Sequence, residues 1–113
     1  MAFEAKYLHG DSRTMDYTPG ADVSAGDVVV ISNTVLVGIA RESIANAALG
    51  ALDVGGGIYD VKVVSNYAQG SKVYWDNSLN AATTTSTNNT PFGFTVETSP
   101  AANSIVEVMH WPF

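Results

Sequence analysis

The sequence predicts an all-β protein, a single small β-barrel or β-sandwich with short hairpins and little or no helix. Val, Ile and Thr, which favour strands, outnumber the helix-forming Leu, Glu and Lys by more than two to one. Short apolar or alternating segments also recur between clusters of Gly, Pro, Asn, Asp and Ser. Strands at this close spacing are typical of a barrel or a sandwich.

Extended segments are expected throughout the chain, each bounded by residues that favour turns. They cover residues 5–9, 14–17, 28–32, 35–40, 58–64, 72–76, 81–85, 92–97 and 104–109. The triple glycine at 55–57 is expected to form a flexible turn that precedes the strand at 58–64.

The apolar segments 28–32 and 35–40 are expected to form a hairpin. Asn33 and Thr34 connect them, and Asn33 can adopt a positive φ. Both arms are apolar at consecutive positions, which predicts burial on two faces. The one helical candidate is the Ala-rich segment 42–52, which Gly50 and the triple glycine limit to two or three turns. The residues favour a non-helical segment there.

The length predicts one domain over residues 1–113, with a core at about 6–109 and apolar terminal segments at 1–5 and 110–113. A chain of 113 residues buries roughly 65% of its surface, which allows one modest core and no second.

Charge and hydropathy exclude several classes of partner. The formal net charge is −6, and no two of the five basic residues are adjacent, so there is no basic patch for nucleic acid. The longest apolar run, 28–31, is far too short to span a membrane, and the first residues lack the apolar region of a signal peptide. We therefore expect a soluble, unprocessed chain. The absence of Cys excludes disulfides and thiolate metal sites.

No catalytic, cofactor or metal site is expected. His9 and His110 would approach each other, near Asp11 or Asp16, only if the terminal strands paired, and their spacing does not indicate a metal site. Both histidines are interpreted as scattered surface residues. Gly70-Ser71-Lys72 has the wrong order for a phosphate-binding loop, and there is no nucleophile elbow for a serine hydrolase. The acidic residues near turns, Asp11, Asp16, Asp22 and Asp27, are interpreted as turn caps. An enzyme domain therefore has little support.

Tyr74-Trp75-Asp76 is the most distinctive local motif. On a strand, Val73 and Trp75 share one face while Tyr74 and Asp76 share the other, which favours one aromatic in the core and a turn after Asp76. The alternative is a small carbohydrate- or ligand-binding module that uses Tyr67, Tyr74 or Trp75 as a stacking platform. That alternative requires exposed rings, so an inward-facing Trp75 would exclude it.

Both ends of the chain carry aromatic residues. Phe3, Tyr7, Trp111 and Phe113 would be costly to leave in water, so they are predicted to pack either on their own domain or on a neighbouring subunit. We interpret these four residues as candidate interface residues.

Several segments in succession carry a family resemblance, above all Ala25-Gly26-Asp27-Val28-Val29-Val30 and Gly70-Ser71-Lys72-Val73-Tyr74-Trp75-Asp76. In their order and spacing they resemble the capsid decoration, or cement, proteins of tailed phages and prophages, over about residues 6–109. The resemblance implies a β-tulip-like domain without catalytic residues. It also implies that Gly26, Asp27, Gly70, Tyr74, Trp75 and Asp76 define turns and core.

The resemblance further implies a structural role in the virion. Proteins of this kind are made in the bacterial host cytoplasm, bind the capsid exterior and bridge neighbouring major capsid proteins, often as a homotrimer. Some members are described as a domain of unknown function or as predicted phage recombinases of the RecA/RadA type. A recombinase needs a nucleotide-binding α/β core, a phosphate loop and DNA-binding cations, which this sequence lacks.

Overall fold

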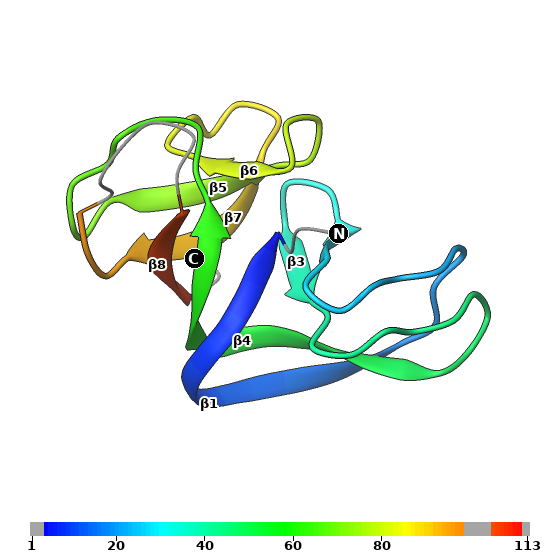
Figure 1. The fold of residues 1–113 in the computed structure, drawn as a ribbon. Coiled ribbons are helices and arrows are strands. Elements are labelled where there is room, and N and C mark those ends of the chain that lie inside the picture. The colour runs from blue at the N-terminus through cyan, green and yellow to red at the C-terminus, as the bar shows by residue number, and fades with distance from the viewer. Residues whose placement is uncertain (1–3, 99–104, 112–113) are drawn as a thin grey trace.

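The computed structural model describes residues 4–98 and 105–111, which form strands and loops without a helix. Eight strands make one curled antiparallel sheet that forms a half-barrel, which confirms the all-β prediction (Figure 1). The strands are β1 (Ala5–Tyr17), β2 (Val28–Ser32), β3 (Leu36–Ile39), β4 (Gly50–Lys62), β5 (Lys72–Asp76), β6 (Ala81–Thr83), β7 (Thr90–Thr95) and β8 (Ile105–His110). The absence of helix in these residues also means that none of them forms a helix long and apolar enough to cross a membrane.

The sheet curls so that its far edge returns to its centre. The strand order is β2-β3-β4-β8-β7-β5-β6, and β1 pairs with β4. Just beyond the end of β4, Val63 forms a parallel bridge with Ala82 of β6, and Val64 N–H donates to the Ala82 carbonyl oxygen at 3.2 Å. These contacts tie β6 to the end of β4 and enclose the apolar interior.

The triple glycine lies inside β4, so the prediction of a turn at 55–57 is wrong. β1 and β4 run side by side and bend together, and the bend lies where Gly10, Gly56 and Gly57 take positive φ (Figure 1). A Cβ at Gly56 would collide with the Asp11 carbonyl oxygen, so close approach of the two backbones requires glycine there. The segments predicted at 5–9 and 14–17 are accordingly one bent strand.

The predicted hairpin is confirmed, with a difference in its turn. β2 and β3 pair from Val28–Ile39 to Ser32–Leu36, but the residue with positive φ is Thr34 instead of Asn33. Residues 42–52, the helical candidate, form a loop followed by the first residues of β4.

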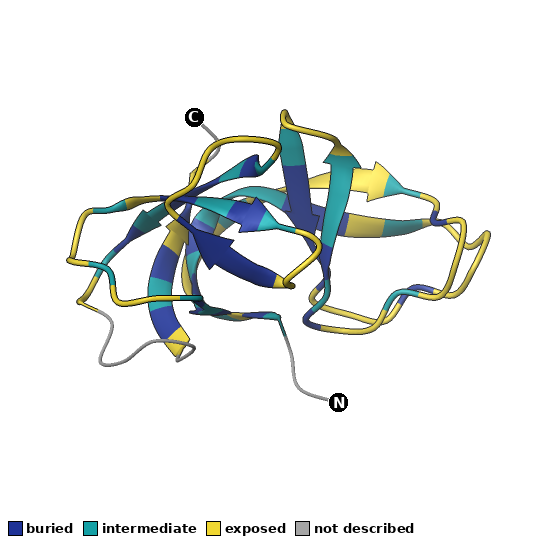
Figure 2. Ribbon diagram, turned by 90° about the horizontal axis from the view of Figure 1, so that it is seen from above, coloured by how far each residue is buried: buried dark blue, intermediate teal, exposed yellow. Residues whose placement is uncertain are grey.

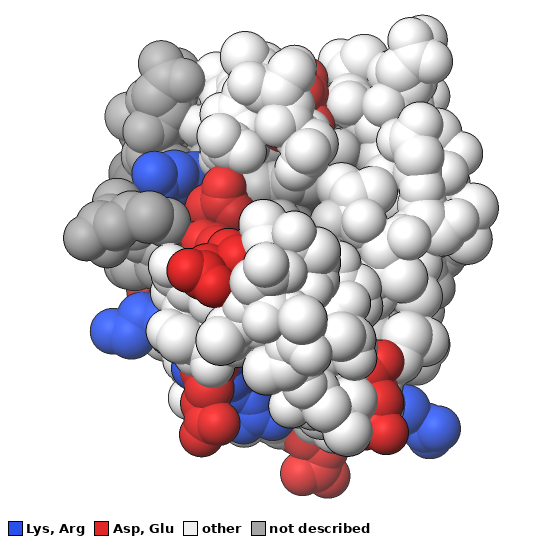
Figure 3. Space-filling view, turned by 90° about the vertical axis from the view of Figure 1, so that its right-hand side faces the viewer, with Lys and Arg blue, Asp and Glu red and all other residues white. Residues whose placement is uncertain are grey.

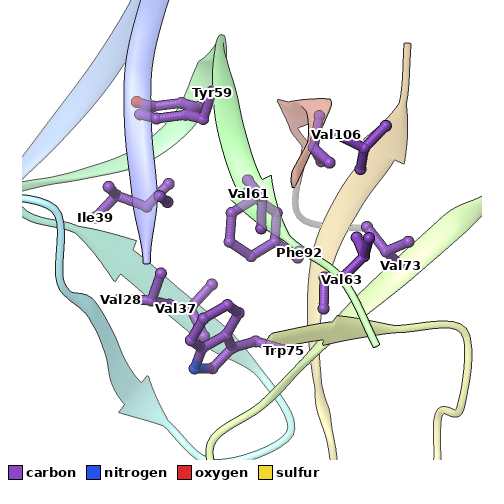
Figure 4. Close-up of a cluster of buried hydrophobic side chains, with 13 residues drawn as sticks. Val28, Val37, Ile39, Tyr59, Val61, Val63, Val73, Trp75, Phe92 and Val106 are labelled. Carbon is purple, nitrogen blue, oxygen red and sulfur yellow. The ribbon is translucent and has the colours of Figure 1, made fainter. Parts of the chain in front are cut away.

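The main core fills the interior of the curled sheet. Trp75, Tyr59 and Phe92 are its largest fully buried side chains, surrounded by valines from five strands and by Val63 just beyond β4 (Figure 4). Valine packs well on pleated strands, so a sequence rich in β-branched residues can fill this interior.

A smaller second cluster lies outside the main core, so the expectation of a single core is wrong. It consists of Ala40, Ile44 and Leu52, with Val23 and Tyr17 packed against it. Ile44 packs directly on Gly50, where a Cβ would lie 2.7 Å from its side chain. A bridge between Val23 and Ile44 joins the two loops that cover this cluster.

This second cluster supports an arm that projects from the barrel. The arm contains the second half of β1, the first half of β4 and the loops at 18–27 and 40–49 (Figure 1). Seen from above, most of the arm's loops are exposed, whereas buried residues concentrate in the barrel (Figure 2).

Candidate functional site

A buried carboxylate stands where the arm meets the barrel. Asp53 of β4 is 3% exposed, and its Oδ2 accepts hydrogen bonds from Arg41 Nε at 2.6 Å and from the Tyr59 hydroxyl at 2.8 Å. Ser12 of β1 donates from Oγ to Asp53 Oδ1 at 3.3 Å. The carboxylate thus links β1, β4 and the loop that follows β3.

Arg41 closes this network on its solvent side. One of its terminal amino groups donates to Ser12 Oγ at 2.5 Å, and its guanidinium lies 4.0 Å from the centre of the Tyr7 ring. The hydrogen bond with Asp53 raises the pKa of Arg41. Burial, together with the neighbouring Asp53, raises the pKa of Tyr59 far above its ordinary value. Both residues therefore keep their protons, and both carboxylate oxygens of Asp53 already accept hydrogen bonds. The arrangement therefore suits a structural role instead of acid or base catalysis. We name the network of Ser12, Arg41, Asp53 and Tyr59 the lock around Asp53.

None of the site residues predicted from the sequence is Arg41, Asp53 or Tyr59. The one local indication was an acidic residue between Leu52 and Val54, in an apolar stretch of what proves to be a strand. A charge buried at such a position requires partners.

The two histidines occupy different environments and do not meet. His9 is exposed on β1, whereas His110 of β8 is fully buried, and β4 lies between these two strands. Among the described residues no group of three or more His, Asp and Glu could hold a metal ion. The interpretation of both histidines as surface residues is wrong for His110.

His110 is packed among aromatic rings. Its ring centre lies 5.1 Å from that of Phe92 and 6.0 Å from that of Tyr59. Neither ring nitrogen has a hydrogen-bond partner among the described residues. Burial lowers the pKa of His110 to about 4, although the charge of Asp53 and the nearby Val37 backbone oppose this shift. The imidazole is therefore neutral and acts as part of the core.

The motif around Trp75 turns inward. Trp75 is 1% exposed and packs near Phe92, while Tyr74 is half-buried on the opposite face and Tyr67 packs against the core. The buried Trp75 rules out the stacking platform that the ligand-binding alternative required. Asp76 lies at the following turn, where its Oδ1 accepts the Ser78 hydroxyl at 2.6 Å and the Ser78 N–H at 3.0 Å. These hydrogen bonds, above all that from the hydroxyl, lower the pKa of Asp76.

The residues expected to define turns occupy connecting positions. Gly26 has a positive φ; its carbonyl oxygen accepts from Ala5 N–H at 3.0 Å, and its own N–H donates to Ala40 at 2.6 Å. Asp27 caps its turn by accepting Ser24 N–H at 2.9 Å. Gly70, also at positive φ, donates from N–H to the Thr95 carbonyl at 2.8 Å.

The predicted interface residues divide between interior and surface. Tyr7 is half-buried: its hydroxyl donates to the Gly10 carbonyl at 2.6 Å, and its ring packs edge-on against Tyr59. Trp111, in contrast, is 56% exposed. Phe3 and Phe113 lie outside the described residues.

Trp111 is part of an apolar patch on the outer face of the sheet. Met109, two residues earlier, is 37% exposed and pairs with Ile58 on one side and Phe94 on the other, both half-buried. Trp111 also lines a hollow of about 430 Å³ beside Val54, Gly55 and Gly56 of the bent ribbon. We name Ile58, Phe94, Met109 and Trp111 the outer patch.

Comparison with known proteins gives one family. The model of the phage cement protein family matches residues 9–110, nearly the whole chain. No curated protein and no solved structure matches the sequence.

Proposed function

The chain belongs to the phage cement protein family, a capsid-associated structural family, and we propose that it binds the outer surface of the phage head and stabilises contacts between major capsid proteins. Family membership carries this proposal. It implies a location in the capsid of the virion. We propose that the protein acts without catalysis, after synthesis in the host cytoplasm.

The fold supports a mechanical role of this kind. A cement protein must keep its shape while neighbouring capsid subunits are under strain, which calls for a well-packed scaffold. The curled sheet, tied from β6 to the end of β4, and the lock around Asp53 supply rigidity without a mobile catalytic site. Many copies on one shell also allow individually weak contacts to act together.

We further propose that the protein acts as a homotrimer and that the outer patch lies between copies. Trp111 is the exposed aromatic residue of the patch, and aromatic side chains concentrate at the centres of interfaces. Tyr7 stays a predicted interface residue, and its ring and hydroxyl also make contacts inside the subunit.

Co-sedimentation with expanded, undecorated heads of the cognate phage tests the proposed function. Purified protein is titrated to saturation, and the bound mass is counted per head. We expect saturable binding at a stoichiometry that matches the local three-fold positions, and greater resistance of the decorated heads to heat. Absence of saturable binding, or binding that leaves head stability unchanged, would contradict the proposal.

A further inference from the structure

Charged residues are absent from two long segments that meet in the fold. Residues 28–40 and 77–96 contain no Asp, Glu, Lys or Arg. The turn of the β2–β3 hairpin reaches the start of β7, where Thr34 N–H donates to Thr90 Oγ1 at 3.0 Å. In Figure 3 the upper part of the molecule is mostly uncharged, and charged side chains gather along the lower and left edges. We name residues 33–35, 77–80 and 84–89 the uncharged end.

The uncharged end has the composition of an interface centre. Val35 is 62% exposed and Leu79 60% exposed, each among exposed Ser, Thr and Asn residues. The loops at 77–79 and 85–89 also border a hollow of about 510 Å³. Interface centres are depleted in charge and combine apolar anchors with neutral hydrogen-bonding groups.

The loops of the uncharged end are ordered by their own hydrogen bonds. Asp76 Oδ1 accepts the N–H groups of Ser78 and Leu79 at 3.0 and 3.2 Å, so this neighbouring carboxylate is directed into its own turn. Asn89 donates from Nδ2 to the Thr85 carbonyl oxygen at 2.9 Å. Loops held in this way lose little conformational freedom when they bind a partner, which favours association.

The chemistry of this surface selects a neutral protein partner. Nucleic acid and anionic lipid require a cluster of Lys or Arg, and the uncharged end contains neither residue. Lys62 borders a hollow with Leu79 and Asn80, but a single lysine does not form a basic patch. Stacking of a glycan requires an exposed aromatic ring, and none of its residues is aromatic. Hydroxyl, amide and isolated aliphatic groups instead complement an uncharged protein surface with small apolar depressions.

We propose that the uncharged end is the surface that contacts the capsid, docking Val35 and Leu79 onto a neutral site on the outer face of the shell. This inference rests on the proposed cement function and adds which surface binds and what kind of site receives it. The outer patch remains available on another part of the sheet for contacts between copies.

Binding of single-lysine variants to undecorated heads tests this assignment. Leu79→Lys and Val35→Lys place a charge on the uncharged end, and Leu49→Lys is the matched control, since Leu49 is a loop leucine on the arm that is 73% exposed. All three variants are first shown to keep the circular dichroism spectrum and melting temperature of the parent protein. Affinity is then measured by co-sedimentation at about 50 mM and about 500 mM NaCl.

We expect each variant of the uncharged end to bind about ten-fold or more weakly, because docking would bury an unpaired charge. Leu49→Lys should bind as the parent does, and salt should change the parent's affinity by less than about three-fold. If the parent binds saturably while Leu79→Lys and Val35→Lys bind equally well, or if salt abolishes binding, the assignment is wrong although the cement function stands. If the parent does not bind at all, both fail.

Discussion

Arg41 and Asp53 form an ion pair of 2.6 Å between a half-exposed guanidinium and a carboxylate that is almost completely buried. The pair joins the loop after β3 to the bend of β4, and it places Arg41 over the Tyr7 ring. A buried carboxylate is tolerated only when its partners are retained, so the pair holds the arm against the barrel.

Removal of Arg41 should therefore destabilise the protein. Arg41→Ala leaves the Asp53 carboxylate buried with only hydroxyl donors, and we expect a loss of about 2 to 3 kcal/mol in the free energy of unfolding. Urea denaturation followed by circular dichroism measures it. Arg13→Ala, at an exposed position of β1, is the control and should change stability by no more than about 0.5 kcal/mol. Equal effects of the two substitutions would show that the pair does not lock the arm.

The buried His110 predicts a loss of stability in acid. Its pKa in the folded protein is about 4, below the ordinary 6.5, so the unfolded chain binds this proton at higher pH. The stabilisation from a neutral His110 is fully present above pH 6.5 and is lost as the pH falls towards 4. The loss approaches about 3 kcal/mol, since each pKa unit corresponds to about 1.4 kcal/mol.

Comparison with His110→Phe isolates this effect from the other titrating groups. The free energy of unfolding is measured for both proteins at pH values between about 7 and 4. The difference between parent and variant should shift steadily in favour of the variant as the pH falls below 6.5. A difference that does not change with pH would show that His110 becomes protonated in the folded state without penalty.

At Gly93 the backbone of β7 lies so close to β8 that there is no room for a side chain. A Cβ at this position would overlap the Met109 carbonyl oxygen, so Gly93→Ala must separate the two strands. We expect a loss of about 4 kcal/mol or more, or failure to fold. Gly20→Ala is the matched control, because no atom lies within 4 Å of the added Cβ. Thermal unfolding of both variants checks the prediction, which a parent-like melting temperature of Gly93→Ala would contradict.

The fold class was predictable because it depends on local composition and alternation, as in the hairpin of β2 and β3. The bend at Gly56 could not be predicted, because a run of glycines favours a turn and a shared bend of two paired strands equally well. Burial of His110 had an unused indication: Val106 and Val108 precede it at intervals of two, which places all three on the inward face.

The lock around Asp53 could not be predicted from the sequence, for a different reason. Its partners lie 12 residues away at Arg41 and 41 residues away at Ser12. The pairing of β3 with β4 brings Arg41 to Asp53, and the pairing of β1 with β4 brings Ser12 there. No spacing rule predicts that juxtaposition. Long-range contacts of this kind follow from the topology of the sheet.

Four aromatic residues are predicted at the interface, and substitution of the two that the structure describes, Tyr7 and Trp111, should separate their roles. Tyr7→Ala removes a ring that packs on Tyr59 and lies beneath Arg41, so it should lower stability by about 2 to 4 kcal/mol. Trp111→Ala removes a side chain that is 56% exposed, so the stability of the single subunit should change by less than about 1 kcal/mol. Sedimentation velocity and binding to undecorated heads then report on association.

If the outer patch lies between copies, Trp111→Ala should lower the oligomer mass and weaken head binding, because cooperation between linked subunits is lost. Met109→Ala, in the same patch, should act in the same direction with a smaller effect, since Met109 is 37% exposed and presents less area. Met15→Ala, at a residue 41% exposed on the arm, provides a matched control that should leave the mass unchanged. If Trp111→Ala keeps the oligomer mass of the parent, the contact between copies does not involve the outer patch. If it also binds heads as the parent does, Trp111 is not an interface residue.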